Sequence, residues 1–215
     1  MLDINIGRHH FQAFPQRALY WPAQDCLLIA DLHLGKADTF RRFGIAVPQA
    51  VQWSDLNRLS SLIHQLKPLR CLVLGDFVHG HTVNAATVDA WNTVVASAPH
   101  TQFELLLGNH DRALPSSILS LHAVNSDLVL DGVWLSHEPV PVQQLTQGYE
   151  LNIHGHIHPA MHIDGSRSKL PALVHRSPYL MMPAFSEFTA GVAGYAMGDA
   201  VWVFAQDASL VMRVR

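Results

Sequence analysis

Cysteine, charged residues and long apolar runs are all scarce in this sequence of 215 residues. The two cysteines, Cys26 and Cys71, lie inside the apolar runs CLLIA and CLVLG, which indicates buried thiols and argues against a disulfide or a cysteine metal site. No apolar run reaches the roughly 18 residues of a membrane helix. The opening MLDINIGRHHFQAFPQR is too polar for a signal peptide. We therefore expect a soluble, cytoplasmic protein with no membrane partner.

Basic charge is not in excess either. Charged residues make up 14% of the chain, and the formal net charge is −3 at pH 7. The chain thus lacks the overall basic field of a protein that coats nucleic acid, so an anionic substrate would have to be attracted locally. The hydrophobic fraction of 49%, without a repeat or a linker, is typical of one globular domain over residues 1–215.

Histidine, by contrast, is abundant: 15 histidines exceed the 14 lysines and arginines together. Three of them, His154, His156 and His158, alternate in the stretch LNIHGHIHP. Gly155 and Pro159 indicate that the chain turns there, so the three imidazoles need not share one role. Taken alone, the triplet fits a metal site and a polar patch bonded to backbone equally well.

Short apolar runs of β type recur along the chain, and most end in a residue that can bind a metal ion. The predicted strands are residues 17–21, 26–30, 71–75, 103–108, 133–136 and 149–153. The side chains that follow them are Asp31 with His33, Asp76, Asn109 with His110, His137 and the histidine triplet. Ligands gather beyond the carboxyl ends of strands in open α/β sheets, so we expect these residues to converge on one site.

Helical patterns lie between these strands. Residues 48–67 and 83–98 are predicted helices, followed by Pro68 and Pro99 respectively. Residues 201–205 and 210–214 flank the turn QDAS and read as a hairpin. The chain is therefore predicted to be α/β with an antiparallel ending.

In chain order, the strand-end residues form five short motifs. They are Asp-Leu-His at 31–33, Gly-Asp at 75–76, Gly-Asn-His-Asp at 108–111, a lone histidine at 137, and Gly-His-Ile-His at 155–158. This series resembles the calcineurin-like metallophosphoesterase superfamily, in which the same elements occur in the same order. The resemblance implies a hydrolase with a sandwich of two mixed β-sheets flanked by helices.

The resemblance also implies two divalent metal ions held by seven side chains. It assigns Asp31, His33 and His158 to one ion, Asn109, His137 and His156 to the other, and Asp76 as the bridge between them. Two such ions, two carboxylates and a bridging hydroxide leave a net charge of about +1, which would attract a phosphodiester despite the acidic chain. The bridging hydroxide would attack the phosphorus in line with the leaving group.

The remaining polar residues near the motifs have other expected roles. By the resemblance, His110 would lie beside the leaving group and Asp111 would orient it. His154 is left without a metal, and we expect it to pack or to support a ligand. His79 and His81 follow Asp76 closely enough to line the cleft, but the sequence assigns them no role.

Two longer segments, DLHLGKADTFRRFGIAVP at 31–48 and MPAFSEFTAG at 182–191, resemble the ligase-associated DNA damage response endonucleases, the PdeM branch of the superfamily. Ala190 stands where that branch often has a glycine. The resemblance implies a manganese-dependent phosphodiesterase that cuts DNA, with single-stranded DNA favoured, beside an ATP-dependent DNA ligase and a helicase in repair. The ligand types also admit iron or zinc.

A basic cluster, Lys36, Arg41 and Arg42, lies close to Asp31 and has two interpretations. It is either a solvated loop or a set of phosphate contacts that position a DNA strand without reading its sequence. Phe40 and Phe43 are interleaved with it and would either stack on unpaired bases or belong to the core.

Two other functions remain open at this stage. The first is a phosphatase or pyrophosphatase of nucleotides or another small phosphorylated metabolite, with the same metals. The second is a protein-interaction scaffold on a degenerate site, which the presence of His110 disfavours.

Overall fold

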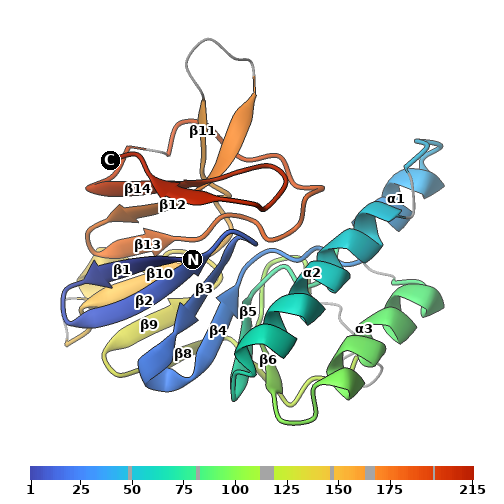
Figure 1. Cartoon of the computed structure of the whole chain (residues 1–215), viewed down its shortest axis with the longest axis horizontal. Coiled ribbons are helices and arrows are strands. Elements are labelled where there is room, and N and C mark those ends of the chain that lie inside the picture. The colour runs from blue at the N-terminus through green and yellow to red at the C-terminus, as the bar shows by residue number, and fades with distance from the viewer. Residues whose placement is uncertain (48–49, 81–82, 112–118, 146–147, 163–167, 196) are drawn as a thin grey trace.

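The computed structural model describes residues 1–47, 50–80, 83–111, 119–145, 148–162, 168–195 and 197–215, which form two β-sheets with helices on one side (Figure 1). The first sheet has seven strands in chain order: β1 (Leu2–Ile6), β2 (His9–Phe14), β3 (Ala18–Trp21), β4 (Cys26–Ile29), β5 (Arg70–Leu74), β6 (Gln102–Leu106) and β7 (Ala123–Asn125). Strands β1 to β4 pair antiparallel, and β4 to β7 pair parallel. The sheet is therefore mixed.

The second sheet is also mixed. Its order is β15-β14-β12-β13-β10-β9-β8, and β11 pairs with β12 outside this path. The strands are β8 (Asp127–Leu130), β9 (Val133–Ser136), β10 (Leu151–His154), β11 (Ala160–His162), β12 (Lys169–Arg176), β13 (Tyr179–Met181), β14 (Ala200–Phe204) and β15 (Val211–Arg213). Strand β10 is parallel to both β9 and β13, and the other pairs are antiparallel.

Helices cover one face of the first sheet. In Figure 1, α2 (Ala50–Leu66) and α3 (Ala85–Ser97) lie side by side against the parallel strands, on the opposite side from the second sheet. The shorter helices are η1 (Pro22–Gln24), α1 (Lys36–Arg42) and α4 (Val142–Leu145). The predicted sandwich of two mixed sheets flanked by helices is confirmed.

The unbroken apolar runs of the parallel strands follow from burial on both faces. Leu28 and Leu72 point into the core between the two sheets. Leu27, Ile29 and Val73 point the other way, into the core beneath α2 and α3. Because neither face meets water, the strands are largely apolar between their ends, and the buried exception, Glu104 in β6, is paired with Arg70 of β5.

The predicted elements correspond closely to those observed. The six predicted strands become β3, β4, β5, β6, β9 and β10, and the terminal hairpin is the antiparallel pair β14 and β15. The predicted helices become α2 and α3, although residues 48–49 lie outside the described part of the chain.

The loop interpretation of the basic segment is wrong, because residues 36–42 form helix α1. The helix begins after Gly35, which has a left-handed backbone conformation with a φ of 80°. Seven residues make fewer than two helical turns, which is too few for an apolar period to show in the sequence.

Two smaller expectations concern the thiols and the membrane. Cys26 and Cys71 are free and buried, as predicted. Among the described residues, no helix combines the length and the apolar character needed to cross a membrane.

Candidate metal centre

The polar residues predicted to converge follow the carboxyl ends of parallel strands in both sheets. In the first sheet, Asp31, Asp76 and Asn109 come shortly after β4, β5 and β6. In the second sheet, His137 follows β9 and His156 follows β10. The two sheets thus bring their polar ends to a common edge.

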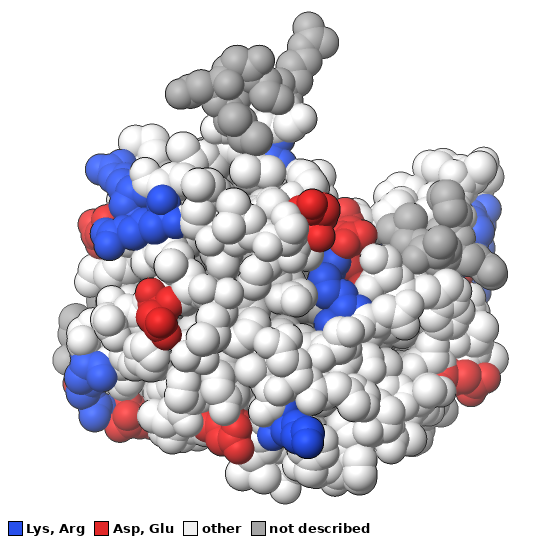
Figure 2. All heavy atoms as spheres, viewed as in Figure 1, with Lys and Arg blue, Asp and Glu red and all other residues white. Residues whose placement is uncertain are grey.

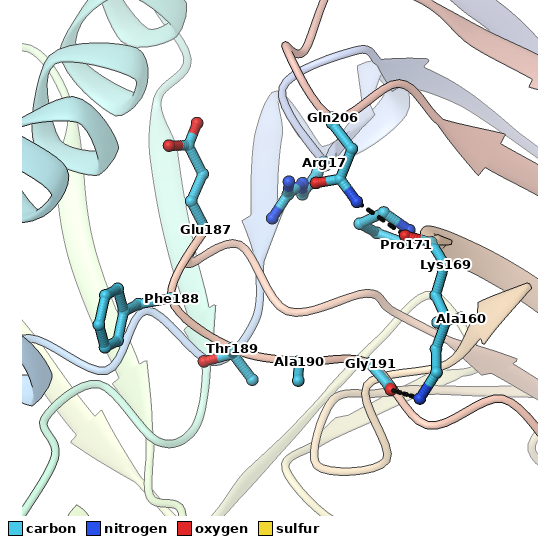
Figure 3. Close-up of a pocket in the computed structure, with 10 residues that line it drawn as sticks. All are labelled: Arg17, Ala160, Lys169, Pro171, Glu187, Phe188, Thr189, Ala190, Gly191 and Gln206. Atoms are coloured by element: carbon cyan, nitrogen blue, oxygen red, sulfur yellow. Dashed lines mark hydrogen bonds between the residues drawn. The ribbon is translucent and has the colours of Figure 1, made fainter. Parts of the chain in front are cut away.

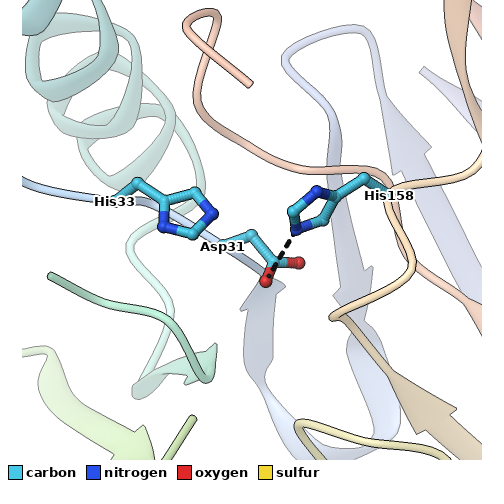
Figure 4. Close-up of side chains that lie close together, drawn as sticks. All are labelled: Asp31, His33 and His158. Carbon is cyan, nitrogen blue, oxygen red and sulfur yellow. Dashed lines mark ion pairs between the residues drawn. The ribbon is translucent and has the colours of Figure 1, made fainter. Parts of the chain in front are cut away.

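One group of ligand atoms consists of Asp31, His33 and His158, whose atoms all lie within 4.8 Å of one another (Figure 4). His158 Nε2 is 3.1 Å from Asp31 Oδ1. Both ring nitrogens of His33, and His158 Nε2, are buried without a hydrogen-bond partner among the described residues. Burial also lowers the pKa of His33 to about 2, so its imidazole is neutral and one nitrogen offers a lone pair. These features fit a bound cation.

A second group consists of Asp31, Asp76 and His137, again with ligand atoms within 4.8 Å. His137 Nδ1 lies 3.1 Å from the carbonyl oxygen of Leu74, an acceptor, so Nδ1 carries the proton and Nε2 carries the lone pair. The Nε2 atom of His137 lies 3.0 Å from Asn109 Oδ1 and 3.4 Å from Asp76 Oδ1. Acceptor atoms that converge in this way fit a bound cation between them.

The remaining expected ligand, His156, lies at the same position. Its Nδ1 is 3.1 Å from His137 Nε2, and its backbone N–H donates to both carboxylate oxygens of Asp31, at 3.1 and 3.3 Å. Asp31 is common to both groups, whereas Asp76 belongs to the second group alone. The bridging role of Asp76 stays a prediction.

Five of the seven expected ligands have backbone conformations that non-glycine residues rarely adopt. The φ angles are 55° at Asp31, 49° at His33, 45° at Asp76, 67° at His156 and 50° at His158. Left-handed conformations of this kind are unfavourable by about 1–2 kcal/mol per residue. Their concentration at one edge of the sandwich is typical of a functional site.

Two motif glycines are explained by close packing around these ligands. A Cβ atom on Gly75 would lie 2.2 Å from His137 Nδ1, and one on Gly155 would lie 2.6 Å from Asp31 Oδ2. Neither His137 nor Asp31 is a flexible surface side chain that could move aside. The glycines that precede Asp76 and His156 therefore leave space for the opposite ligand.

His110 lies at the mouth of the site, outside both ligand groups. Its side chain is 40% exposed, its Nε2 is 3.9 Å from Asp76 Oδ2, and its backbone N–H donates to Asp76 Oδ1 at 3.1 Å. The ring is 5.8 Å from that of His33 and 5.2 Å from that of His79. Its expected contact with the leaving group stays a prediction. His79 does line the site, while His81 lies outside the described residues.

Asp111 has a structural role that the sequence did not predict. Its buried carboxylate accepts three backbone N–H groups, from Phe77 at 3.2 Å, Val78 at 3.0 Å and Gly108 at 2.9 Å. Both oxygens are thus engaged in joining the loops after β5 and β6. Asp111 positions the backbone beside Asp76 and Asn109, and its expected orientation of His110 stays a prediction.

His154 packs inside the protein, as expected. It is buried, its Nδ1 lies 2.9 Å from the carbonyl oxygen of Gly155, and its ring contacts Tyr179 with 5.8 Å between centroids. Burial lowers the pKa of His154 to about 4.

The segment MPAFSEFTAG, which no motif chemistry explains, supports the Asp31 loop. The N–H groups of Phe185 and Ser186 donate to the carbonyl oxygens of Ala30 and Asp31 at 2.7 and 3.4 Å. Arg58 of α2 donates to the carbonyl oxygen of Phe185 and lies over its ring at 4.4 Å. Sequence reasoning missed this role because hydrogen bonds to a distant backbone leave no residue pattern.

The three basic residues of α1 are placed differently from one another. Lys36 is half-buried and donates to Thr189 Oγ1 at 2.9 Å. Arg41 donates to the carbonyl oxygen of Val47 at 3.1 Å and pairs with Asp38. Arg42 is exposed at the end of the helix, beside Phe43.

The two phenylalanines of this segment also differ in their environment. The ring of Phe40 packs against that of Phe188, with 5.3 Å between centroids. The side chain of Phe43 is 79% exposed. Phe40 is therefore part of the protein's own packing, and Phe43 is accessible to a ligand.

Comparisons with known proteins agree with this geometry. The profile described as calcineurin-like phosphoesterase matches residues 26–204. No curated protein is close enough in sequence to count as a relative. The nuclease MPE of Pseudomonas putida has a similar structure, with a TM-score of 0.82, 29% identity and 99% of each chain covered. Yfce, a phosphoesterase from E. coli, has a TM-score of 0.51 at 15% identity, covering 88% of this chain and 97% of its own, and shows the fold alone.

Proposed function

The chain belongs to the calcineurin-like phosphoesterase family, and from this premise we propose that it is a manganese-dependent phosphodiesterase that cleaves DNA, preferentially single-stranded DNA. The hydrolytic phosphoesterase class follows from the family. The substrate is supported by the likeness to the Pseudomonas putida nuclease, which extends over 99% of both chains. The proposal further includes a cytoplasmic role in DNA repair beside an ATP-dependent ligase and a helicase, which rests on the two segments that resemble the ligase-associated branch.

One observation carries the chemistry: nitrogen and oxygen ligand atoms from both sheets converge on Asp31. Histidine and carboxylate ligands suit manganese, iron and zinc, and the choice of manganese rests on the resemblance. When bound, two divalent ions polarise phosphoryl oxygens and lower the pKa of a bound water from about 15.7 to roughly 7. Asp31, His33 and His158 would hold one ion, Asn109, His137 and His156 would hold the other, and Asp76 would bridge the two.

The protein's own backbone and side-chain groups would position and protonate the reacting groups. The carbonyl oxygen of Leu74 fixes the tautomer of His137, and the backbone N–H of His156 fixes the carboxylate of Asp31. His110, exposed at the mouth and adjacent to Asp76, would donate a proton to the leaving oxygen. A proton donor that makes no metal contact permits turnover and metal binding to be separated experimentally.

The distribution of surface charge favours DNA binding through a few local contacts over binding along an extended basic surface. On the face in Figure 2, lysine and arginine side chains lie in separate small patches with acidic patches among them. Such a surface does not follow a duplex over a long distance. A single strand that enters the metal centre, with a few phosphate contacts nearby and Phe43 as a stacking surface, suits this distribution better.

The test is to incubate the manganese-loaded protein in parallel with single-stranded DNA, duplex DNA, a panel of nucleotides and bis-p-nitrophenyl phosphate. We expect cleavage of single-stranded DNA and of the small diester. His110→Ala is the matched control for a contaminating nuclease: it should lose about 10²–10⁴-fold in turnover and retain both metal ions by elemental analysis.

Other outcomes point to the other functions. Hydrolysis of nucleotides or other small phosphorylated metabolites with intact DNA would identify a phosphatase or pyrophosphatase. If the metal-loaded protein hydrolyses none of these substrates, the remaining function is that of a protein-interaction scaffold. Loss of metal from His110→Ala would make His110 a ligand.

A further inference from the structure

A cavity of about 450 Å³ lies beside the metal centre, and its residues have no role in the chemistry described above (Figure 3). Residues 187–191 form one wall, and Lys169 and Pro171 of β12 form the opposite wall. Arg17 and Gln206 close one end. Cavities of about 300–1,000 Å³ are the size that accommodates small ligands or one unit of a polymer. We call it the Arg17 cavity.

The Arg17 cavity adjoins the metal ligands through several contacts. Ala160 in its wall is two residues after His158, and the carbonyl oxygen of His158 accepts the N–H of Val192 at 2.8 Å. Thr189 in the opposite wall accepts the hydrogen bond of Lys36. Phe188 lines both this cavity and a small pocket that contains His33 and Lys36. The wall of the cavity therefore continues into the backbone of the ligand His158.

The cavity contains a buried cation that is poorly satisfied. Arg17 is 2% exposed, and among the described residues its guanidinium makes one hydrogen bond, from Nη1 to the carbonyl oxygen of Ser186 at 3.1 Å. Its Nε has no partner among those residues. A buried guanidinium normally makes several charge-assisted hydrogen bonds, most often to carboxylate or phosphate. An anion in the cavity would supply the missing acceptors.

The other charges of the cavity leave a positive balance. Lys169 runs along the wall and donates a long hydrogen bond of 3.4 Å to the carbonyl oxygen of Gly191. Glu187 is the acid of the lining, and it shares Arg58 with Asp55, so the two cations of the lining exceed its one carboxylate by a single positive charge. Arg17 and Lys169 thus face the cavity from two sides, while Ala190 and Gly191 add no bulk to it (Figure 3).

We infer that the Arg17 cavity binds the phosphate of a nucleotide adjacent to the scissile phosphodiester, held between Arg17 and Lys169. The inference rests on the proposed function and extends it, because it fixes the path of the strand on the His158 side of the metal centre. A polymer reaches both the metal ions and the cavity, whereas a small diester reaches the ions alone. The two substrates therefore respond differently to changes in the cavity.

The test uses charge changes at Lys169, which is exposed and therefore tolerant of substitution. We compare Lys169→Glu and Lys169→Gln with Arg176→Glu, a matched control at the exposed opposite end of the same strand, β12. The substrates are a single-stranded oligothymidylate and bis-p-nitrophenyl phosphate, with the manganese-loaded full-length protein. Metal content and melting temperature are recorded for each variant.

We expect Lys169→Glu to raise KM for the oligothymidylate about tenfold or more, the equivalent of one lost charge-assisted contact. The kcat/KM for the small diester should stay within about twofold of wild type, and Arg176→Glu should resemble wild type on both substrates. Lys169→Gln should reduce the slope of log affinity against log salt by about 0.7, the value for one phosphate contact on a single strand.

Each alternative outcome has a definite meaning. If wild type cleaves the oligothymidylate and Lys169→Glu behaves like Arg176→Glu, the cavity inference is overturned and the proposed function stands. Equal losses on both substrates would also overturn it, because they would indicate damage to the metal centre. If wild type hydrolyses the small diester but no DNA, the proposed DNA substrate fails and the inference fails with it.

Discussion

Gly75 is a residue at which the backbone packs tightly against a metal ligand. Its φ is 73°, and an added Cβ would lie 2.2 Å from Nδ1 and 2.5 Å from Cβ of His137. We predict that Gly75→Ala displaces His137, and that activity on bis-p-nitrophenyl phosphate falls by at least about 10–100-fold, the range found when a metal ligand loses its support. Elemental analysis should show less than full metal occupancy.

The control for this substitution is Gly7→Ala, which also has a positive φ, of 56°, but no atom within 4 Å of the added methyl group. It should cost about 1 kcal/mol in backbone strain and leave activity unchanged. Full activity and occupancy in Gly75→Ala would contradict the placement of His137 over the loop that follows β5.

The residue scale also shows what a sequence can reveal about a site. Asp31, Asp76 and His137 could be predicted because a polar residue that directly follows a buried apolar run is conspicuous, and because strand ends meet in space. The sequence indicated Asp111 as a site residue but not its structural role, because its three partners are backbone N–H groups, which nearly every residue type has. The contact between Lys36 and Thr189 spans 153 residues and has no local pattern.

At the scale of elements, α1 combines a structural arginine and an exposed one. Arg41 holds the end of the helix through Val47 and Asp38, whereas Arg42 is exposed beside Phe43. We predict that Arg42→Ala weakens binding of single-stranded DNA and lowers its salt slope by about 0.7, with hydrolysis of bis-p-nitrophenyl phosphate unchanged. Binding is measured across a salt series, with calcium in place of manganese if calcium proves inert in cleavage.

Arg41→Ala is the informative partner of that variant. It should lower the melting temperature, because the part-buried Asp38 loses its cation and Val47 loses a donor. If both variants lose DNA binding to the same extent and neither changes stability, α1 acts as one basic surface and the distinction between its two arginines is wrong.

The strands that the sequence predicted most clearly are those buried on both faces. Strands β4, β5 and β6 are mostly apolar because the second sheet covers one face and α2 and α3 cover the other. Strands β1 and β8, which are less buried, alternate in exposure and were not predicted. Helix α1 was missed because its position depends on Phe188 and Thr189, which are distant in sequence.

At the scale of the whole molecule, the two sheets depend on each other for the site. The first sheet supplies Asp31, His33, Asp76 and Asn109, and the second supplies His137, His156 and His158. Local patterns could predict strands within each sheet, but they contain no information on how the sheets pair, so the sandwich had to be inferred from the order of the five motifs. The metal ions would act as cross-links between the two layers.

This arrangement predicts that metal binding stabilises the entire fold. An ion that binds only the folded state stabilises it by about 2.7 kcal/mol when its free concentration is 100 times the dissociation constant. For a chain of this size, 1 kcal/mol shifts the melting temperature by about 2–4 °C. We therefore expect manganese at that concentration to raise the melting temperature by roughly 5–10 °C over the protein in EDTA, as measured by calorimetry.

The variants Asp76→Ala and His100→Ala distinguish manganese binding at the metal centre from manganese binding elsewhere on the protein. Asp76 is buried between the ligand histidines, and its removal should abolish most of the manganese-induced shift. His100 is exposed and precedes β6, whereas Asn109 follows the opposite end of that strand, so the His100 variant should keep the full shift. The comparison is made within each variant, with and without metal, because removal of a buried carboxylate also relieves its repulsion with Asp31 in the metal-free protein. A full shift in Asp76→Ala, or equal melting temperatures of wild type in EDTA and manganese, would show that the two sheets are not joined through these ligands.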